Sequence, residues 1–219
     1  GRALLTSGKP VEALAALDKA VERDPNEAFY WADRGGVLRA LSRHDEARAA
    51  WTKALTLNKA CVPALLGLAD AEKRAGRPKD AIPYLMEAAG LEPQNAEAWF
   101  EIGDAYRQVR DWPHAYGAFA MSVKAAPRNA LAIVGLAEGA LNVGKLDDAL
   151  AALEVAIGLD DGIALAFYLR GVAFAIKGLN GEAAEAHRRA VELDPSRVHA
   201  WHGLARCLHE LKRYSEALD

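Results

Sequence analysis

Three histidines near the end of the sequence have side chains and a spacing that could bind a metal ion. His199 and His202 stand three residues apart, and His209 follows seven residues later, so all three share one face if the segment is helical. Zinc requires a tetrahedral ligand set, and no carboxylate or thiolate nearby obviously completes one. We therefore expect no metal ion here and interpret the three histidines as polar helix surface.

Other motifs that carry chemistry are missing from the sequence. Residues 7–10, Ser-Gly-Lys-Pro, resemble part of a phosphate-binding loop, but the earlier glycine is not at the required spacing and Pro10 replaces the Ser or Thr. The sequence has no HExxH, CxxC or Gly-x-Ser-x-Gly motif, and its two cysteines, Cys61 and Cys207, are too far apart for a disulfide framework. We expect no catalytic residue and no cofactor.

Composition excludes further classes of function. The net charge of −3 and the pI near 6.1 provide no basic face for nucleic acid. The sequence contains neither an apolar run long enough to span a membrane nor a leader peptide, so we expect no direct insertion into a membrane. Because it begins with Gly1 and not Met, we expect it to be part of a longer protein, and its compartment stays open.

An internal repeat organises the whole sequence. The segments Val21–Gly36 and Val191–Arg206 both begin Val-Glu-x-Asp-Pro and carry a Trp six residues after the Pro, and their starting positions differ by five times 34. Without any insertion, this period gives seven units in one array over residues 1–219. They are 1–27 (partial), 28–61, 62–95, 96–129, 130–163, 164–197 and 198–219 (partial).

Each unit has the pattern of two amphipathic helices. We number the places of a unit from 1 to 34. Place 20 is alanine in all seven units, place 8 is always Gly or Ala, and places 4 and 24 hold large side chains in nearly every unit. Places 4, 7, 8 and 11 follow helical spacing, as do places 20, 24 and 27. Small residues at place 8 should let helix backbones approach closely, with a neighbouring aromatic filling the gap.

The period of 34, the two-helix rhythm and the Trp, Gly, Ala and Pro places resemble the tetratricopeptide repeat (TPR) family over the whole sequence. The resemblance implies an all-α fold, a right-handed superhelical solenoid of antiparallel helix pairs. It also implies that the first helices line a concave groove through places 2, 5, 9 and 12. Glu72 and His187 depart from the family at places 11 and 24. Trp99 and Tyr106 are expected between helices, in the core.

Two stripes of residues at the groove places are candidate partner-binding surfaces. The central units carry a charged stripe, Asp70, Asp104 and Glu138 at place 9 with Arg39, Lys73 and Arg107 at place 12. These residues either neutralise each other, as the i,i+3 pairs Asp70/Lys73 and Asp104/Arg107, or align a mixed-charge peptide. Later units carry an apolar stripe, Leu131, Val134, Leu141, Leu165, Tyr168, Val172 and Ile176. Either a partner segment or a missing part of the same chain is expected to cover it.

The sequence therefore predicts a non-enzymatic scaffold or adaptor that binds a peptide or helix segment of a protein in its concave groove. One alternative is the substrate-recruiting TPR region of a larger enzyme, such as a transferase, whose catalytic domain lies outside this sequence. Neither end shows a polar capping helix, so the array is expected to continue or to meet another domain. Self-association through the uncapped ends is a third possibility.

Overall fold

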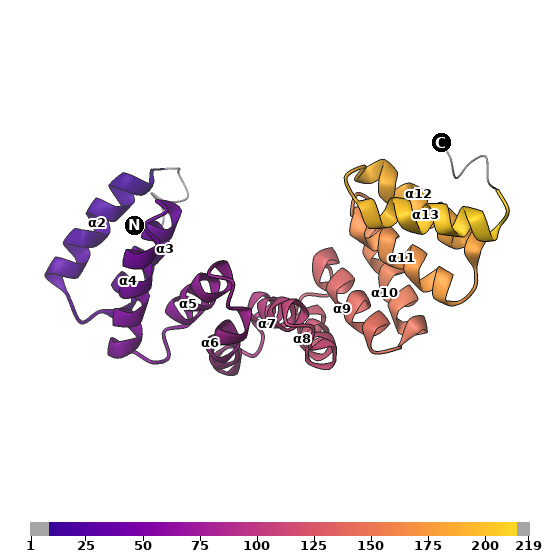
Figure 1. The fold of residues 1–219 in the computed structure, drawn as a ribbon. Coiled ribbons are helices and arrows are strands. Elements are labelled where there is room, and N and C mark those ends of the chain that lie inside the picture. Colours follow the sequence, from indigo (N-terminus) through magenta and orange to yellow (C-terminus); the bar gives the residue numbers. More distant parts are fainter. Residues whose placement is uncertain (1–8, 214–219) are drawn as a thin grey trace. The chain divides into compact units, whose positions relative to one another are not determined.

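The computed structural model describes residues 9–213, and within that range its regular secondary structure is entirely α-helical (Figure 1). The all-α prediction is confirmed. First helices of the repeats span 13 residues each and begin at the residues that open the units: α3 (Ala28–Ala40), α5 (Val62–Arg74), α7 (Ala96–Gln108), α9 (Ala130–Asn142), α11 (Ala164–Ile176) and α13 (Val198–Glu210). Second helices span 14 residues each: α2 (Pro10–Arg23), α4 (His44–Leu57), α6 (Pro78–Leu91), α8 (Trp112–Ala125), α10 (Leu146–Leu159) and α12 (Asn180–Leu193).

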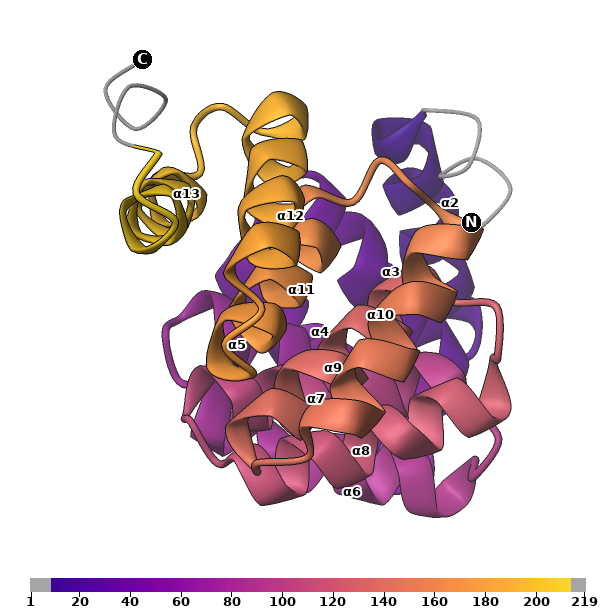
Figure 2. The same ribbon diagram turned by 90° about the vertical axis from the view of Figure 1, so that its right-hand side faces the viewer.

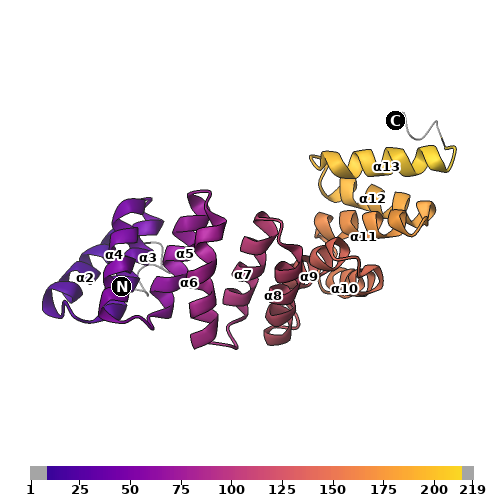
Figure 3. The ribbon, with the colours of Figure 1, turned by 60° about the horizontal axis from the view of Figure 1, so that its bottom comes forward.

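The chain forms two compact units, residues 1–109 and residues 110–219. In the first unit, α3 packs against α4 and α5 against α6 as neighbouring helix pairs, and α3 also contacts the next first helix, α5 (Figure 3). In the second unit, α12 packs against both α11 and α13 (Figure 2), and α11 contacts α9 and α13. No helix within residues 9–213 is both long and apolar enough to cross a membrane.

Alanine at place 20 marks the closest helix contacts. The side chains at this place in the described repeats are at most 1% exposed: Ala13, Ala47, Ala81, Ala115, Ala149 and Ala183. A side chain as small as a methyl group allows neighbouring helices to pack closely at this place. The corresponding Ala217, like Gly1 at place 8, lies outside the described residues.

The turn within each helix pair needs one residue with a left-handed backbone, at place 15. Gly76, Gly144 and Gly178 have φ angles of 73° to 80°. Glycine adopts such angles without steric cost, which explains why Gly76, Gly144 and Gly178 follow the ends of first helices. The same place in other repeats holds Ser42, Arg110 and Lys212, also at positive φ. The repeat geometry therefore overrides the backbone preference of these three residues.

A tryptophan at place 4 ties a first helix to the turn before it. The indole Nε1 atoms of Trp31, Trp99 and Trp201 each donate a hydrogen bond of 2.9 Å to the carbonyl oxygen of the proline six residues earlier. The repeated Pro and Trp are therefore explained by one contact. Trp99 and Tyr106 were expected in the core, but both side chains are only partly buried. An indole that must reach the turn carbonyl lies over the turn.

Glu72 replaces the usual apolar residue at place 11 and is 7% exposed. Its carboxylate accepts hydrogen bonds from Arg48 of α4 and from Arg77 in the turn before α6. Hydrogen bonding to Arg48, supported by Arg77, keeps the pKa of Glu72 below its ordinary value although burial acts in the opposite direction. A buried carboxylate thus joins three consecutive segments of the first unit through charge-assisted hydrogen bonds.

Glu72→Ala should lower the free energy of unfolding by about 1–2 kcal/mol, because it removes the hydrogen bonds from Arg48 and Arg77, whose side chains remain partly hydrated. Urea unfolding followed by circular dichroism measures this loss. Glu87→Ala, an exposed glutamate on α6, is the matched control and should change stability by no more than about 0.5 kcal/mol. Equal stabilities of the two variants would contradict the structural role of Glu72.

Candidate functional site

The side chain at place 24 determines what can line the surface between two first helices. In the first unit, Trp51 of α4 is inserted between Gly35 of α3 and Gly67 of α5. A Cβ atom added to Gly67 would lie 2.3 Å from Trp51 Cε2, and one added to Gly35 would lie 2.4 Å from Trp51 Nε1. The indole donates a hydrogen bond of 3.2 Å to the carbonyl oxygen of Ala32. The prediction that small residues admit a neighbouring aromatic is confirmed at this position.

The same arrangement recurs in every second repeat. Phe119 would lie 2.6 Å from a Cβ added to Gly135, and His187 would lie within 2.7 Å of one added to Gly171 or Gly203. In the alternate repeats, place 24 is leucine and place 6 of the following repeat holds a larger residue. Those pairs are Leu17 with Asp33, Leu85 with Glu101, and Leu153 with Leu169. A flat ring at place 24 is therefore accompanied by glycine at place 6 of the following repeat. A leucine at place 24 is accompanied by a larger residue there.

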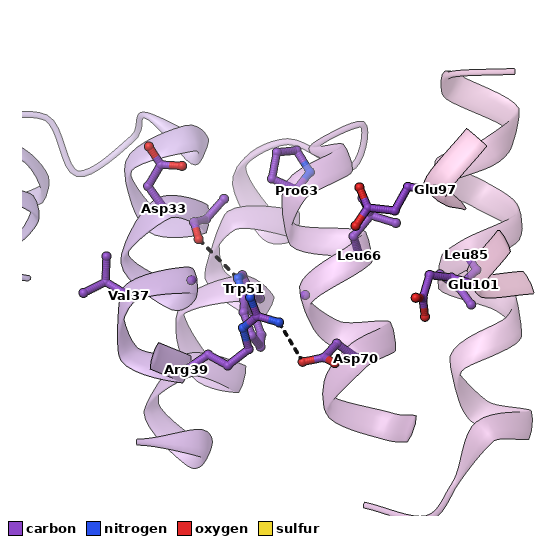
Figure 4. A pocket seen from close by; sticks show the side chains of 13 residues that line it. Asp33, Val37, Arg39, Trp51, Pro63, Leu66, Asp70, Leu85, Glu97 and Glu101 are labelled. Carbon is purple, nitrogen blue, oxygen red and sulfur yellow. Dashed lines mark hydrogen bonds and ion pairs between the residues drawn. The ribbon is translucent and has the colours of Figure 1, made fainter. Parts of the chain in front are cut away.

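A cavity of about 350 Å³ opens above Trp51, between α3, α5 and α7 of the first unit (Figure 4). In the close-up view, Trp51 lies in the middle of the lining, with Asp33 on one side and Glu97 and Glu101 on the other. Asp70 is the fourth carboxylate of the lining, Arg39 is the cation, and Pro63, Leu66 and Leu85 supply apolar surface. We call this space the acidic cavity. The surplus of carboxylates favours a cationic group.

The charged stripe connects successive first helices by ion pairs. Arg39 at the end of α3 binds Asp70 of α5 at 3.1 Å, and Lys73 at the end of α5 binds Glu101 and Asp104 of α7 at 2.5 and 2.6 Å. Burial would lower the pKa of Lys73, but hydrogen bonds to Asp104 and Glu101 raise it above its ordinary value. The charges therefore stabilise neighbouring helices as well as shaping the surface.

One predicted pair within the charged stripe is wrong and one is confirmed. Asp70 does not bind Lys73 in its own helix; it binds Arg39 and, at 2.9 Å, Arg74. Lys73 instead binds Glu101 and Asp104 of the next first helix, α7. The pair of Asp104 with Arg107 is present at 2.5 Å. Glu138 of α9 is partly buried and lies in the second unit.

The structure divides the apolar stripe into exposed and packed residues. Leu131 and Ile176 are 59% and 58% exposed. Leu141, Leu165 and Tyr168 are partly buried and pack against core clusters, and Val172 is also partly buried. Contrary to the expectation of an open apolar wall independent of the core, three residues of the stripe pack against core clusters, and Leu131 and Ile176 are its exposed members.

Val134 is a clear correction. It was predicted to line the groove, but it is 2% exposed and belongs to a core cluster with Ala166 and Leu169 of α11. Its place on α9 faces the next first helix at close range, so the neighbour covers it. Val134 therefore contributes to the stability of the second unit and cannot contact a partner directly.

The histidines at the end of the chain take part in a second, smaller pocket. His199 and His202 of α13 line a space of about 230 Å³ together with Tyr168 of α11 and His187 of α12. His187 is 1% exposed, and its Nδ1 atom has no hydrogen-bond partner. His209 is exposed, outside this lining. Within residues 9–213 no three His, Cys, Asp or Glu side chains form a set that could hold a metal ion.

The sequence marks His187 as a departure at place 24 but does not reveal the pocket. Burial, and secondarily the charge of Arg206, lowers the pKa of His187 to about 4, so its imidazole is neutral near pH 7. The signal in the sequence was a polar ring at a place where other repeats have Trp, Phe or Leu, combined with Gly203 at place 6 of the following repeat.

Comparison with known families identifies the chain. The model of the C-terminal TPR domain of cilia and flagella-associated protein 70 matches residues 1–219. The chain belongs to this family. Two curated proteins are similar to part of this chain. The general transcriptional corepressor trfA of Dictyostelium discoideum is 29% identical over 97 residues. Protein NPGR1 of Arabidopsis thaliana is 30% identical over 96 residues. The matches cover 44% and 42% of this chain but only 7% and 14% of those proteins.

Solved structures show the same fold as this member of the cilia and flagella-associated protein 70 family. YrrB, described as a TPR protein with an unusual peptide-binding site, has a TM-score of 0.80 and 24% identity, covering 87% of this chain and 98% of YrrB. MamA has a TM-score of 0.68 and 27% identity, covering 75% and 96%. Pseudomonas aeruginosa PilF has a TM-score of 0.79 and 18% identity, covering 93% of each chain. The TPR prediction is confirmed, and the fold supports a protein-interaction scaffold.

Gly67→Ala should destabilise this domain by about 2 kcal/mol, because the new methyl group overlaps the Trp51 ring. Gly36→Ala is the matched control in the same cavity lining. No atom lies within 4 Å of its added Cβ, so the variant should gain about 0.5–1 kcal/mol from better helix propensity. Thermal and urea unfolding of both variants measure these changes. Destabilisation by Gly36→Ala, or none by Gly67→Ala, would contradict the described packing.

Acidification should destabilise the domain through His187. In the unfolded chain His187 takes up a proton below its ordinary pKa of 6.5, whereas in the folded chain it does so only near pH 4. The free energy of unfolding therefore falls as the pH drops from about 6.5 to 4. The loss at pH 5 is about 2 kcal/mol. His187→Phe removes this component, and at pH 7 it should match or exceed wild-type stability because the unpaired Nδ1 atom is gone. Urea unfolding of both proteins at pH 7 and pH 5 isolates the difference; an identical pH dependence would contradict it.

Proposed function

We propose that the chain is a non-enzymatic scaffold that binds a basic segment of a protein partner across its first helices, with a Lys or Arg side chain of that segment in the acidic cavity. The observation that carries this proposal is the cavity itself. It combines a volume of about 350 Å³ with four carboxylates and an apolar lining. Its position on first helices is also the groove position that the TPR family implies.

The two kinds of lining suit the two parts of a long basic side chain. Lysine and arginine bury their aliphatic stems on apolar surface and keep the charged head near polar groups. Pro63 and Leu66 would contact the stem, while Glu97 would attract the head. Arg39 and Lys73 already hold Asp70 and Glu101, so these pairs keep the cavity walls in place. Electrostatic attraction of this kind mainly sets partner choice and the association rate.

The exposed part of the apolar stripe is the second element of the proposal. Leu131 and Ile176 stay more than half exposed in the folded second unit. We assign them to apolar side chains of a partner segment that binds the second unit. Membership of the family of cilia and flagella-associated protein 70 supports a partner that is a protein of cilia or flagella.

Selection of peptides from a random display library on the folded chain tests the proposal. The selected peptides should be rich in Lys or Arg, and their affinity, measured by fluorescence anisotropy, should fall as NaCl is raised. Glu97→Lys should weaken binding about tenfold, because it places a cation in the acidic cavity. Glu87→Lys makes the same charge change on α6, away from the lining, and should leave affinity within about twofold.

Acidic or uncharged selected peptides, or equal effects of Glu97→Lys and Glu87→Lys, would contradict a basic segment in the acidic cavity. The double variant Leu131→Asp/Ile176→Asp tests the apolar contacts and should weaken those selected peptides that bind the second unit, while the melting temperature is retained because both side chains are exposed. A lowered melting temperature instead would show that another part of the protein's own chain covers them.

A further inference from the structure

The pocket at His187 occupies the same places of the repeat as the acidic cavity, four repeats later in the sequence. His187 corresponds to Trp51, Gly203 to Gly67, and Arg206 to Asp70. The repeat geometry thus forms a pocket of the same kind in the second unit, but the charge is reversed. Its lining carries Arg206 and three imidazoles and includes no carboxylate.

Two polar groups of this pocket lack partners in the folded chain. His187 is 1% exposed and its Nδ1 atom has no hydrogen bond, which is costly for a buried polar atom. Arg206, at the rim, forms no ion pair within residues 9–213, whereas the equivalent Asp70 binds two arginines. A buried imidazole at the base and an unneutralised guanidinium at the opening both favour an anionic hydrogen-bond acceptor.

We propose that this pocket binds a carboxylate group of the partner, held by the guanidinium of Arg206 and the imidazoles of His199 and His202, above the His187 ring. The carboxylate is either an Asp or Glu side chain or a chain terminus. This inference rests on the proposed function in that the carboxylate belongs to the partner. It adds a subsite of opposite charge to the acidic cavity.

Binding at this pocket is coupled to the proton of His187. Around this ring, α11 presents Tyr168 and α13 presents His199, His202 and Arg206, whereas its own helix surrounds it with Ala183, Ala184, Ala190 and Val191. Arg206 opposes protonation of His187. A carboxylate that neutralises Arg206 removes this opposition and adds an attractive charge. Carboxylate binding therefore raises the pKa of His187, and by linkage the affinity for carboxylate rises as the pH falls from 7 to 5.5.

Imidazole resonances of the histidines, followed by NMR on the intact chain, provide the test. Four probes are titrated: a doubly capped glutamate, the matching capped glutamine, a capped alanine with a free C-terminal carboxylate, and inorganic phosphate. Saturable shifts of His187 with capped glutamate, or with the free terminus, support the proposal and identify the source of the carboxylate. The same titration repeated at pH 5.5 should give about threefold tighter binding or more. Capped glutamine should cause no shift.

Variants separate a binding role from a structural one. Arg206→Met should weaken carboxylate binding about tenfold, whereas Arg128→Met, an exposed arginine of the same unit outside the pocket, should not. His187→Phe should reduce the pH dependence of binding at an unchanged or higher melting temperature, and the part that remains is assigned to His199 and His202, which contact the carboxylate directly. The proposal is overturned if no carboxylate binds, if phosphate binds and carboxylates do not, or if Arg206→Met binds like wild type. These titrations use no basic peptide, so their outcome does not depend on whether the acidic cavity binds a basic segment.

Discussion

The spacing of successive first helices depends on how closely a helix backbone can approach the flat face of a ring. Trp51 fills the space between Gly35 and Gly67, and neither position tolerates a methyl group without overlap. The ring therefore sets the width of the gap above it, and that gap is the acidic cavity. In the second unit, His187 occupies the same space between Gly171 and Gly203. Core packing and the candidate binding surface are thus two faces of one contact.

Ion pairs hold the walls of this gap at fixed positions. A cation near the end of one first helix binds an acid in the next, as Arg39 binds Asp70 and Lys73 binds Asp104. Lys73 and Asp104 are largely shielded from solvent, with side-chain exposures of 15% and 16%, so these pairs are screened less than a surface pair would be. Most charges of the charged stripe therefore have a structural role, and Glu97 of the cavity lining is a better candidate for partner recognition.

The sequence predicted the fold well because the repeat samples each constraint several times. Alanine at place 20 in every unit fixed the helix contacts and the phase of the repeat. Prediction failed where a residue's role depends on a neighbour in another helix or turn. Periodicity does not show that the Trp99 indole donates to Pro93, that Lys73 prefers acids of the next helix, or that α11 covers Val134. Spacing within one helix cannot decide among such partners, because the competing distances differ too little.

The candidate sites were predicted only in outline. Asp70 and Tyr168, two of the predicted groove residues, line the two pockets, but the pockets also require the ring at place 24 from a second helix. The accompanying glycines, Gly67 and Gly203, were visible in the sequence. Their meaning emerges only when the added Cβ atoms are found to overlap the Trp51 and His187 rings.

The alternation of ring and leucine at place 24 makes two repeats, and not one, the true period of the interfaces between repeats. A gain or loss of one repeat would set a ring against Asp33, Glu101 or Leu169, where no space for it exists. A gain or loss of two repeats would restore every pairing. Arrays with this alternation should therefore have changed length during evolution by duplicating or deleting helix quartets, and homologues that differ in length should differ by an even number of repeats.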